Sequence, residues 1–376
     1  MHIIMQNKYQ LIRPLGSGGQ GSVYLVRDLH IDKIWAMKLF LMRKPEWKQS
    51  KVENTKSEEL HMQSEIVALC KVRHERLPML SDAFIVSEKI AKLLISKKKE
   101  DICIAMIMEY IDGINLEMYL QKYGPLSEKE VLRWGIQIVE VLEYLHGRHP
   151  AMIHGDIKPA NLLITQDKNI KLVDFGSAIT ESDTKNKKNA ISKIMGTRGY
   201  LAPELLQRGK AVDTRCDIYS LGITLYYMIT GRNPNMPGFE LQPIRRTDSS
   251  LSVGIERIIE RCTRENPEKR YQTCSEIKKD LTNYKKTELR YQGMIMGIYI
   301  LYEMTTLGAV WLPAIEINRY IANAADMSHG LLVTGIICAV AALFIRKFLL
   351  ERSVQNMHFY RQEISILRTD KEKQIS

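Results

Sequence analysis

The 376-residue sequence predicts an α+β protein with a small β-rich amino-terminal lobe, a larger helical lobe and a C-terminal hydrophobic helical region. Short strand-like apolar runs dominate residues 9–40 and recur at 102–108. Helical patterns then take over, most clearly at 127–146, which opens with a capping box, and at 217–230. Beyond residue 284 the composition shifts to two long apolar segments. An apolar content of 45% and a charged content of 26% indicate a globular chain.

The net charge of +11 suggests a nucleic-acid partner, but the sequence has no stacking-aromatic or basic-helix motif. We therefore expect no nucleic-acid binding, and we attribute the charge to a membrane-facing surface, because Lys and Arg cluster near the apolar segments. The six cysteines form no CxxC pair and no His/Cys metal spacing, which indicates unpaired thiols in a reducing compartment. The apolar run in residues 1–8 is too short for a signal peptide.

A glycine-rich turn lies between the predicted strands 9–15 and 24–26, with glycines at 16, 18, 19 and 21. Without Cβ atoms, its backbone can approach phosphate oxygens and offer N–H donors. A dinucleotide-binding fold can share this spacing, but it needs a helix directly after the glycines. Strand-like residues follow here, so the sequence favours a phosphate-binding hairpin. Lys38 alternates with apolar neighbours in the next strand and should lie on its polar face; a solvated lysine at a strand edge is the alternative.

The clearest catalytic signal in the sequence is the stretch 154–161, followed by the sequence Asp-Phe-Gly at 174–176. Its residues suit phosphoryl transfer from a metal-bound nucleotide to a hydroxyl group. Asp156 can accept the hydroxyl proton, and Lys158 can neutralise charge on the moving group. Asn161 and Asp174 offer oxygens to Mg2+. The alternative is a polar turn followed by a buried β-turn in another α/β domain.

Together these motifs closely resemble the Gly-rich loop, catalytic loop and metal loop of protein kinases. The resemblance runs over residues 9–284 and implies the bilobal protein-kinase fold, with an N-lobe at 9–109 and a C-lobe at 115–284. Lys158, with the Gly-Thr pair at 196–197, resembles serine/threonine rather than tyrosine kinases. The whole chain resembles the eukaryotic-like (Hanks-type) membrane kinases of bacteria. Gly155 departs from the family pattern, which usually has Arg there.

The resemblance implies that Asp156 and Lys158 are catalytic and that Asn161 and Asp174 hold Mg2+ or Mn2+. Lys38 would hold the α- and β-phosphates of ATP. The cofactor-binding residues that it implies are Gly16, Ser17, Gly18, Gly19, Gln20, Gly21, Val23, Ala36, Lys38, Glu65, Met108, Glu109 and Leu163. Among them, Glu65 would pair with Lys38, whereas its rivals Glu58 and Glu59 fit a solvated position better.

The remaining ATP-site residues would surround the base. Met108 would control the pocket behind the adenine, and the backbone from Glu109 would pair with the adenine edge. Val23, Ala36 and Leu163 would enclose the ring. The Lys-rich residues 87–101 read as a solvated loop.

Several other motif residues have structural roles in the family. His154 and Phe175 would complete an apolar stack, so His154 is not a general base. The Thr197 hydroxyl would bond Asp156 and Lys158. Glu204 would pair with Arg270, and Asp217 would brace the catalytic loop. The Lys-rich stretch 177–195, closed by residues 202–204, resembles the activation segment of the family. Since Gly155 cannot bind a phosphate, phosphorylation of this segment at Thr184 or Ser192 should not act as a switch.

Residues 291–350 are predicted to be a membrane region with two transmembrane helices, 294–317 and 329–349, before a polar tail at 351–376. Glu303 and Pro313 weaken the first segment, and the uncharged run 330–345 is short for a span. A single span and a soluble helical pair packed on the large lobe are therefore alternatives. Basic residues flank both ends, which places the kinase domain in the cytoplasm and the protein at the cell membrane as a multi-pass or single-pass protein.

The sequence thus predicts a serine/threonine protein kinase that transfers the γ-phosphate of ATP to protein hydroxyls. Its expected partners are protein substrates with Ser or Thr, the kinase itself through autophosphorylation, and membrane lipid. The rival interpretation is a pseudokinase or nucleotide-sensing scaffold at the membrane. We disfavour it because every group with a chemical role is present.

Overall fold

The computed structural model describes residues 3–18, 21–43, 70, 72–95, 101–181, 196–207, 212–286, 289–291, 293–298, 300–301, 304–305 and 319. The chain divides into two compact units. The first comprises residues 1–244 and 254–284, and the second comprises 245–253 and 285–376. Glu65, the predicted span 329–349 and most of the span 294–317 lie outside the described residues.

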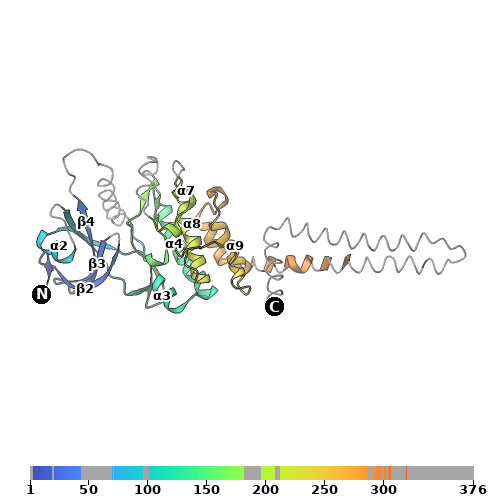
Figure 1. Cartoon of the computed structure of the whole chain (residues 1–376), viewed down its shortest axis with the longest axis horizontal. Helices are drawn as coiled ribbons and strands as arrows, with labels where there is room; N and C mark the ends of the chain where they lie inside the picture. Colours follow the sequence, from blue (N-terminus) through green and yellow to red (C-terminus); the bar gives the residue numbers. More distant parts are fainter. Residues whose placement is uncertain are drawn as a thin grey trace. The chain divides into compact units, whose positions relative to one another are not determined.

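The first unit begins with a six-stranded antiparallel sheet in the order β1-β2-β3-β4-β6-β5, at the blue end of Figure 1. The strands are β1 (Ile4–Met5), β2 (Tyr9–Gly18), β3 (Gly21–Asp28), β4 (Lys33–Arg43), β5 (Leu80–Val86) and β6 (Asp101–Glu109). The predicted strands at 9–15, 24–26, 34–40 and 102–108 all fall within this sheet. Its central strands are the most apolar, as expected where both faces of a strand are buried.

The insertion at residues 87–101 was predicted to be a solvated loop, and that prediction is wrong. It contains helix α2 (Glu88–Leu94), which buries Ala91 against the apolar cluster of the sheet. Ile90 and Leu94 pack on the same cluster, and the Tyr24 hydroxyl donates to the Leu94 carbonyl over 2.8 Å. A narrow apolar face is enough to hold this short helix, because the sheet supplies the surface on which it packs.

Helices dominate the second lobe of this unit, where Figure 1 labels α3, α4, α7, α8 and α9. They are α3 (Leu116–Tyr123), α4 (Glu128–His146), α7 (Pro203–Leu206), α8 (Arg215–Thr230), α9 (Val253–Cys262) and α10 (Cys274–Thr282). The predicted capping box is confirmed, since the Ser127 hydroxyl accepts from the Glu130 amide and the Glu130 carboxylate accepts from the Ser127 amide. Helix α8 is buried along almost its whole length, as its uniformly apolar sequence predicts.

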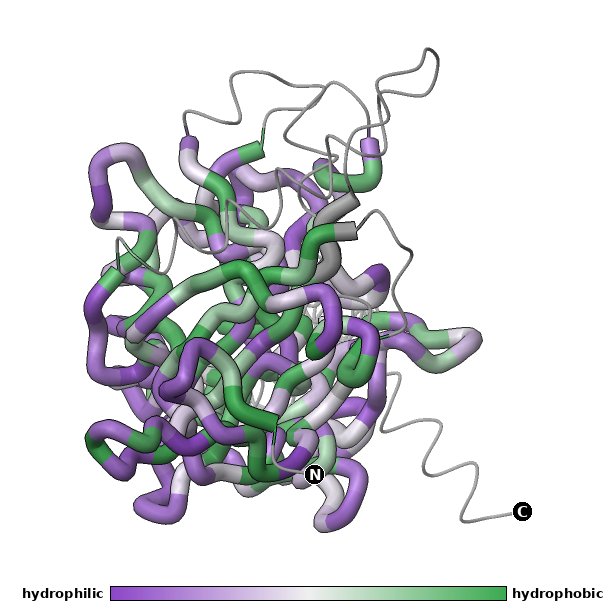
Figure 2. The backbone as a smooth tube through the Cα atoms, turned by 90° about the vertical axis from the view of Figure 1, so that its left-hand side faces the viewer, coloured by the Kyte–Doolittle hydropathy of each residue, from purple (hydrophilic) through white to green (hydrophobic). Residues whose placement is uncertain are grey.

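Two small sheets carry the loops between the lobes. Strands β7 (Gly113–Asn115), β9 (Leu162–Thr165) and β10 (Ile170–Leu172) form one, and β8 (Met152–Ile153) with β11 (Ile179–Thr180) forms the other. The catalytic-loop residues 154–161 therefore run between β8 and β9. In Figure 2, hydrophilic segments follow many of the outer turns, while hydrophobic segments pass through the interior. The predicted α+β fold with a β-rich lobe and a helical lobe is confirmed.

The second unit has a local contact of its own, in which the guanidinium of Arg245 lies 5.8 Å from the centroid of the buried Tyr291 ring. Beyond Tyr291 its described residues are helical, and several carry exposed apolar side chains, namely Ile295, Met296, Ile300, Leu301 and Met304. Among the residues that the structure describes, no helix combines the length and the apolarity that a membrane crossing requires.

Candidate active site

The catalytic loop is held by a buried carboxylate at the start of helix α8. Asp217 accepts the backbone N–H of His154 over 2.9 Å and that of Gly155 over 2.8 Å, as the sequence predicts. Gly155 has a φ of 77°, a conformation that glycine adopts without strain. Because both amides are fixed, the backbone that leads into Asp156 has a defined direction.

Asp156 lies at the centre of a network that joins three predicted site residues. Its Oδ1 accepts the Thr197 amide and hydroxyl over 3.0 and 3.1 Å, and its Oδ2 accepts the Asn161 amide group over 3.0 Å. The Lys158 ammonium lies 2.7 Å from the same Oδ2 and also donates to the Thr197 hydroxyl. The predicted role of Thr197 is confirmed. The loop thus places an acid, a cation and an amide side by side.

Asp174 contacts Lys38 across the two lobes. The Lys38 ammonium lies 2.7 Å from Asp174 Oδ1, and the Gly176 amide donates to the same oxygen over 3.2 Å. Although burial raises the pKa of Asp174, the ammonium of Lys38 and these hydrogen bonds outweigh it and hold the pKa below its usual value. Asp174 is therefore ionised at neutral pH, the state in which a carboxylate can bind a cation.

The prediction that Lys38 lies on a polar strand face is wrong. Lys38 is buried, as are all the residues from Trp35 to Phe40 in β4. Successive side chains of a strand point to opposite faces, so the burial of all six residues shows that both faces of β4 are covered and alternation does not expose one side. The ammonium reaches Asp174 instead of solvent. Its predicted partner Glu65 lies outside the described residues.

His154 is structural, as predicted. Its ring meets that of Phe175 edge to face with 5.0 Å between the ring centroids, and both side chains are fully buried. Burial lowers the pKa of His154, so the imidazole is neutral. Within the described residues its Nε2 has no hydrogen-bond partner.

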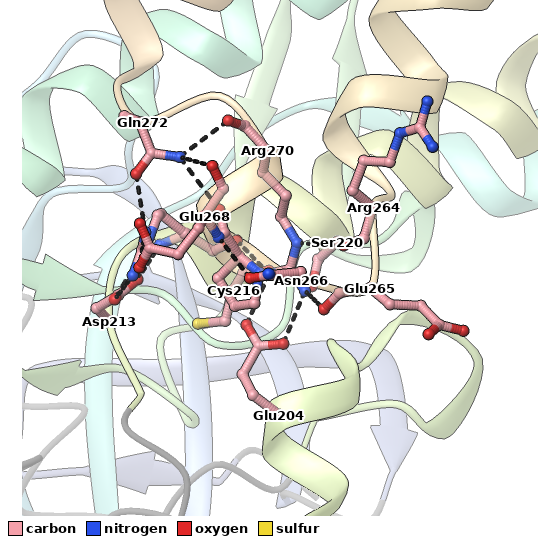
Figure 3. Close-up of polar contacts among 12 residues, drawn as sticks. Glu204, Asp213, Cys216, Ser220, Arg264, Glu265, Asn266, Glu268, Arg270 and Gln272 are labelled. Atoms are coloured by element: carbon pink, nitrogen blue, oxygen red, sulfur yellow. Dashed lines mark hydrogen bonds and ion pairs between the residues drawn. The ribbon is translucent and has the colours of Figure 1, made fainter.

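A buried ion pair stabilises the helical lobe (Figure 3). Arg270 donates to both carboxylate oxygens of Glu204, over 2.6 and 2.7 Å, which confirms the predicted pair. Its other N–H groups reach three backbone carbonyls, those of Arg264, Arg215 and Glu265. The bidentate hydrogen bonds to Glu204 and the three bonds to backbone carbonyls fix the end of the activation segment, which carries Glu204.

Comparison with known proteins agrees with this geometry. A family profile described as protein kinase domain matches residues 9–283, well over half of the chain. The chain belongs to the protein kinase family. Serine/threonine-protein kinase PknB of Mycobacterium tuberculosis is 28% identical over 295 residues, which is 76% of this chain and 44% of PknB.

Two further bacterial relatives show the same extent of similarity. Serine/threonine-protein kinase PrkC of Bacillus subtilis is 29% identical, over 74% of this chain and 40% of PrkC. A putative serine/threonine-protein kinase of Mycoplasma genitalium is 31% identical, over 76% of this chain and 82% of its own length. The chain thus spans less than half the length of PknB and PrkC.

Most of the predicted nucleotide-binding residues of the kinase lie on neighbouring strands of the large sheet, and Leu163 lies in the sheet of β7, β9 and β10. Val23 pairs with Lys38, and Ala36 pairs with the buried Met108. Leu163 lies on β9 opposite Lys171 of β10. In the glycine hairpin Gly16 pairs with Val23, Ser17 with Ser22 and Gly18 with Gly21, while Gly19 and Gln20 lie outside the described residues. A Cβ at Gly21 would come within 2.3 Å of the Leu39 carbonyl oxygen, so only glycine fits there.

The segment 109–113 at the end of β6, which resembles the hinge between the lobes of the kinase family, carries a contact that sequence reasoning missed. The Lys171 ammonium lies 2.6 Å from Glu109 Oε1, and the Glu109 amide donates to the Met79 carbonyl over 2.8 Å. This ties the end of β6 to the hairpin that carries Leu163. No local pattern identifies the pair, because 62 residues separate the two side chains.

The donor set of the kinase fits a hard divalent cation. Protein kinases use ATP with a divalent metal, and the site residues offer a carboxylate at Asp174 and an amide at Asn161. Asn161 gives its NH2 group to Asp156, so its side-chain oxygen is the atom that could bind a cation. Within the described residues there is no group of three or more His, Cys, Asp or Glu side chains able to hold a metal. Two protein oxygens suit Mg2+, which takes its other ligands from water and phosphate.

Proposed function

We propose that this kinase transfers the γ-phosphate of ATP to Ser and Thr hydroxyls of proteins, including its own. The observation that carries the proposal is the network in which Lys158, Asn161 and Thr197 meet around Asp156. Such positioning and electrostatic stabilisation supply most of the rate in phosphoryl transfer. The relatives named as serine/threonine-protein kinases support the same substrate hydroxyls.

Each site residue has a defined task in this proposal. Asp156 orients the substrate hydroxyl and accepts its proton, and Lys158 neutralises charge on the phosphoryl oxygens. Asn161 and Asp174 hold Mg2+ or Mn2+, which would screen the negative charge of the phosphates. Lys38 binds the α- and β-phosphates, held in place by Asp174 and, as the family resemblance implies, by Glu65.

The nucleotide base would lie between the lobes. Val23, Ala36 and Leu163 enclose the adenine, and Met108 closes the back of the pocket. The backbone from Glu109 pairs with the adenine edge. The amides of the glycine hairpin 16–21 bind the phosphates, which fits the need for glycine at Gly21.

Phosphotransfer from labelled ATP to a generic basic protein tests this proposal. The wild-type chain should label both the protein and itself, whereas the Asp156→Asn chain should label neither. ATP should raise the melting temperature of both chains equally, because Asp156 does not bind the nucleotide in this proposal. A wild-type chain that binds ATP but transfers no phosphate would instead establish the pseudokinase.

We also propose that the chain is attached to the cell membrane with its kinase domain in the cytoplasm. The exposed apolar side chains from Ile295 to Met304 support this, because large exposed apolar patches mark protein or membrane contacts. They lie within the first proposed segment, 294–317, of the region 291–350, and the segment 329–349 and the polar tail 351–376 follow. The basic flanks place both ends of the region inside.

Cysteine labelling distinguishes the topologies. In a chain whose native cysteines are replaced, Asn323→Cys and Ser365→Cys are treated with an impermeant thiol reagent in intact cells. Labelling at 323 alone supports a two-helix hairpin. Labelling at 365 alone supports a single span, and labelling at neither position contradicts exposure of this region outside the cell.

A further inference from the structure

A chain of hydrogen bonds runs from helix α10 to the catalytic loop. The Cys274 sulfur lies 3.4 Å from His146 Nδ1, and His146 Nε2 lies 2.9 Å from Asp217 Oδ2. Asp217 in turn accepts the amides of His154 and Gly155, immediately before Asp156. The three side chains come from the start of α10, the end of α4 and the start of α8, and all are largely buried.

Chemistry fixes the direction of each hydrogen bond. Burial raises the pKa of the Cys274 thiol, so the sulfur keeps its proton and can donate to His146 Nδ1. Nδ1 then acts as the acceptor, and Nε2 carries the ring proton that is donated to the Asp217 carboxylate. The other tautomer would turn the Nε2 lone pair toward the carboxylate, which is repulsive.

The state of Asp217 depends on this arrangement. Burial raises the pKa of its carboxyl group, but the hydrogen bond from His146 and the loop amides outweigh burial and lower it overall. An ionised Asp217 accepts from His146, His154 and Gly155 at once. A ring in the wrong tautomer would remove one of these donors and rotate the carboxylate away from the loop.

We propose that Cys274 is a positioning residue for phosphoryl transfer, whose thiol hydrogen-bonds the His146 ring and so holds it where it orients Asp217 and the loop before Asp156. The inference rests on the proposed kinase function of that loop. The competing explanation is that the thiol only fills space between α4 and α10. Two substitutions distinguish these explanations. Serine keeps a hydrogen-bond donor but fills less volume, whereas valine fills the volume but has no donor.

Activity of the full-length chain in lipid nanodiscs provides the first test. Cys274→Ser keeps a donor, and we expect kcat within about twofold of wild type. Cys274→Val fills the space without a donor, and we expect kcat to fall about three- to tenfold with an unchanged KM for ATP. The matched changes Cys262→Ser and Cys262→Val alter another buried thiol, on α9, and should not show this order. A valine variant at least as active as the serine variant overturns the proposal.

The tautomer itself provides the second test and needs no turnover. In the full-length chain labelled with 15N-histidine, the His146 signals are assigned by their loss in His146→Gln. We expect protonated Nε2 and unprotonated Nδ1 in the wild type and in Cys274→Ser, and a changed Nδ1 signal in Cys274→Val. Protonated Nδ1 in the wild type, or an unchanged signal in the valine variant, overturns the proposal. If the wild type shows the expected tautomer without phosphotransfer, the proposed function fails and the tautomer assignment stands.

Discussion

Two ion pairs of this kinase use similar groups in contrasting surroundings. Arg270 and Glu204 are 0% and 3% exposed, form two parallel hydrogen bonds and lie within one lobe. Lys38 and Asp174 are 7% and 27% exposed and join the two lobes through a 2.7 Å contact. The first pair is enclosed by protein, whereas the second keeps one carboxylate partly open.

The difference indicates which pair can change partners. The guanidinium of Arg270 gives its remaining N–H groups to backbone carbonyls, so a ligand has no group left to bind. Asp174 is open enough for a cation, and the Lys38 ammonium can turn to phosphate oxygens when a nucleotide enters. We therefore expect the enclosed pair to support stability and the open pair to support catalysis.

Removing the open carboxylate should have the largest effect. Asp174→Asn keeps an oxygen for the Lys38 ammonium but loses the charge that holds the metal, so activity should fall on the order of a thousandfold. The free energy of unfolding should fall by less than about 2 kcal/mol. Phosphotransfer and urea unfolding measure the two effects. Asp213→Asn, which alters a partly exposed carboxylate 2.7 Å from Arg215, is the matched control and should stay active.

Breaking the enclosed pair should act on stability instead. Arg270→Met leaves Glu204 charged and buried, which should lower the free energy of unfolding by about 3–5 kcal/mol. The double change Arg270→Met with Glu204→Leu should restore part of that loss, because no buried charge remains. Urea unfolding of the three chains measures this. A double variant less stable than either single variant would show that the backbone contacts of Arg270 matter more than its charge.

The hinge pair lies between these extremes, with Lys171 and Glu109 22% and 33% exposed. Lys171→Met should raise the KM for ATP about two- to fivefold and leave kcat unchanged, because the pair holds the hinge against the Leu163 hairpin. The reversed pair, Glu109→Lys with Lys171→Glu, should recover most of the affinity. Lys122→Met, an exposed lysine of α3, serves as the control. A fall in kcat without a change in KM would place the pair outside nucleotide binding.

The smallest effect is expected in the activation segment, where Thr184 and Ser192 lie outside the described residues. The double change Thr184→Ala with Ser192→Ala should leave phosphotransfer within about twofold of wild type. Gly155 offers no cation for a phosphate, and Thr197 already binds Asp156 directly. Initial rates with a peptide substrate test this. A large loss of activity would show that another cation, such as Lys193 or Arg198, binds a phosphate there.

The sequence was sufficient for groups that are close together in the chain or fixed by a motif. The stretch 154–161, the glycine hairpin, the His154–Phe175 stack and the Glu204–Arg270 pair were all predicted. Sequence reasoning failed where distant segments decide the environment. Lys38 was expected on a polar face because its strand was read alone, yet the folded protein covers both faces of that strand.

Two other features were missed for a related reason. Helix α2 has only seven residues, and the three apolar side chains that pack on the sheet, Ile90, Ala91 and Leu94, are recognisable as a buried face only beside that sheet. Cys274 looked like one of several buried thiols, and its contact with His146 joins residues 128 positions apart. Periodicity and motif spacing do not carry such information.

The backbone at Gly155 has a consequence for any side chain placed there. Its φ of 77° would strain any other L-residue by about 1–2 kcal/mol. Gly155→Arg would therefore add a cation beside Asp156 and strain the backbone in the same step. Any phosphate bound by the new guanidinium would first have to offset that strain.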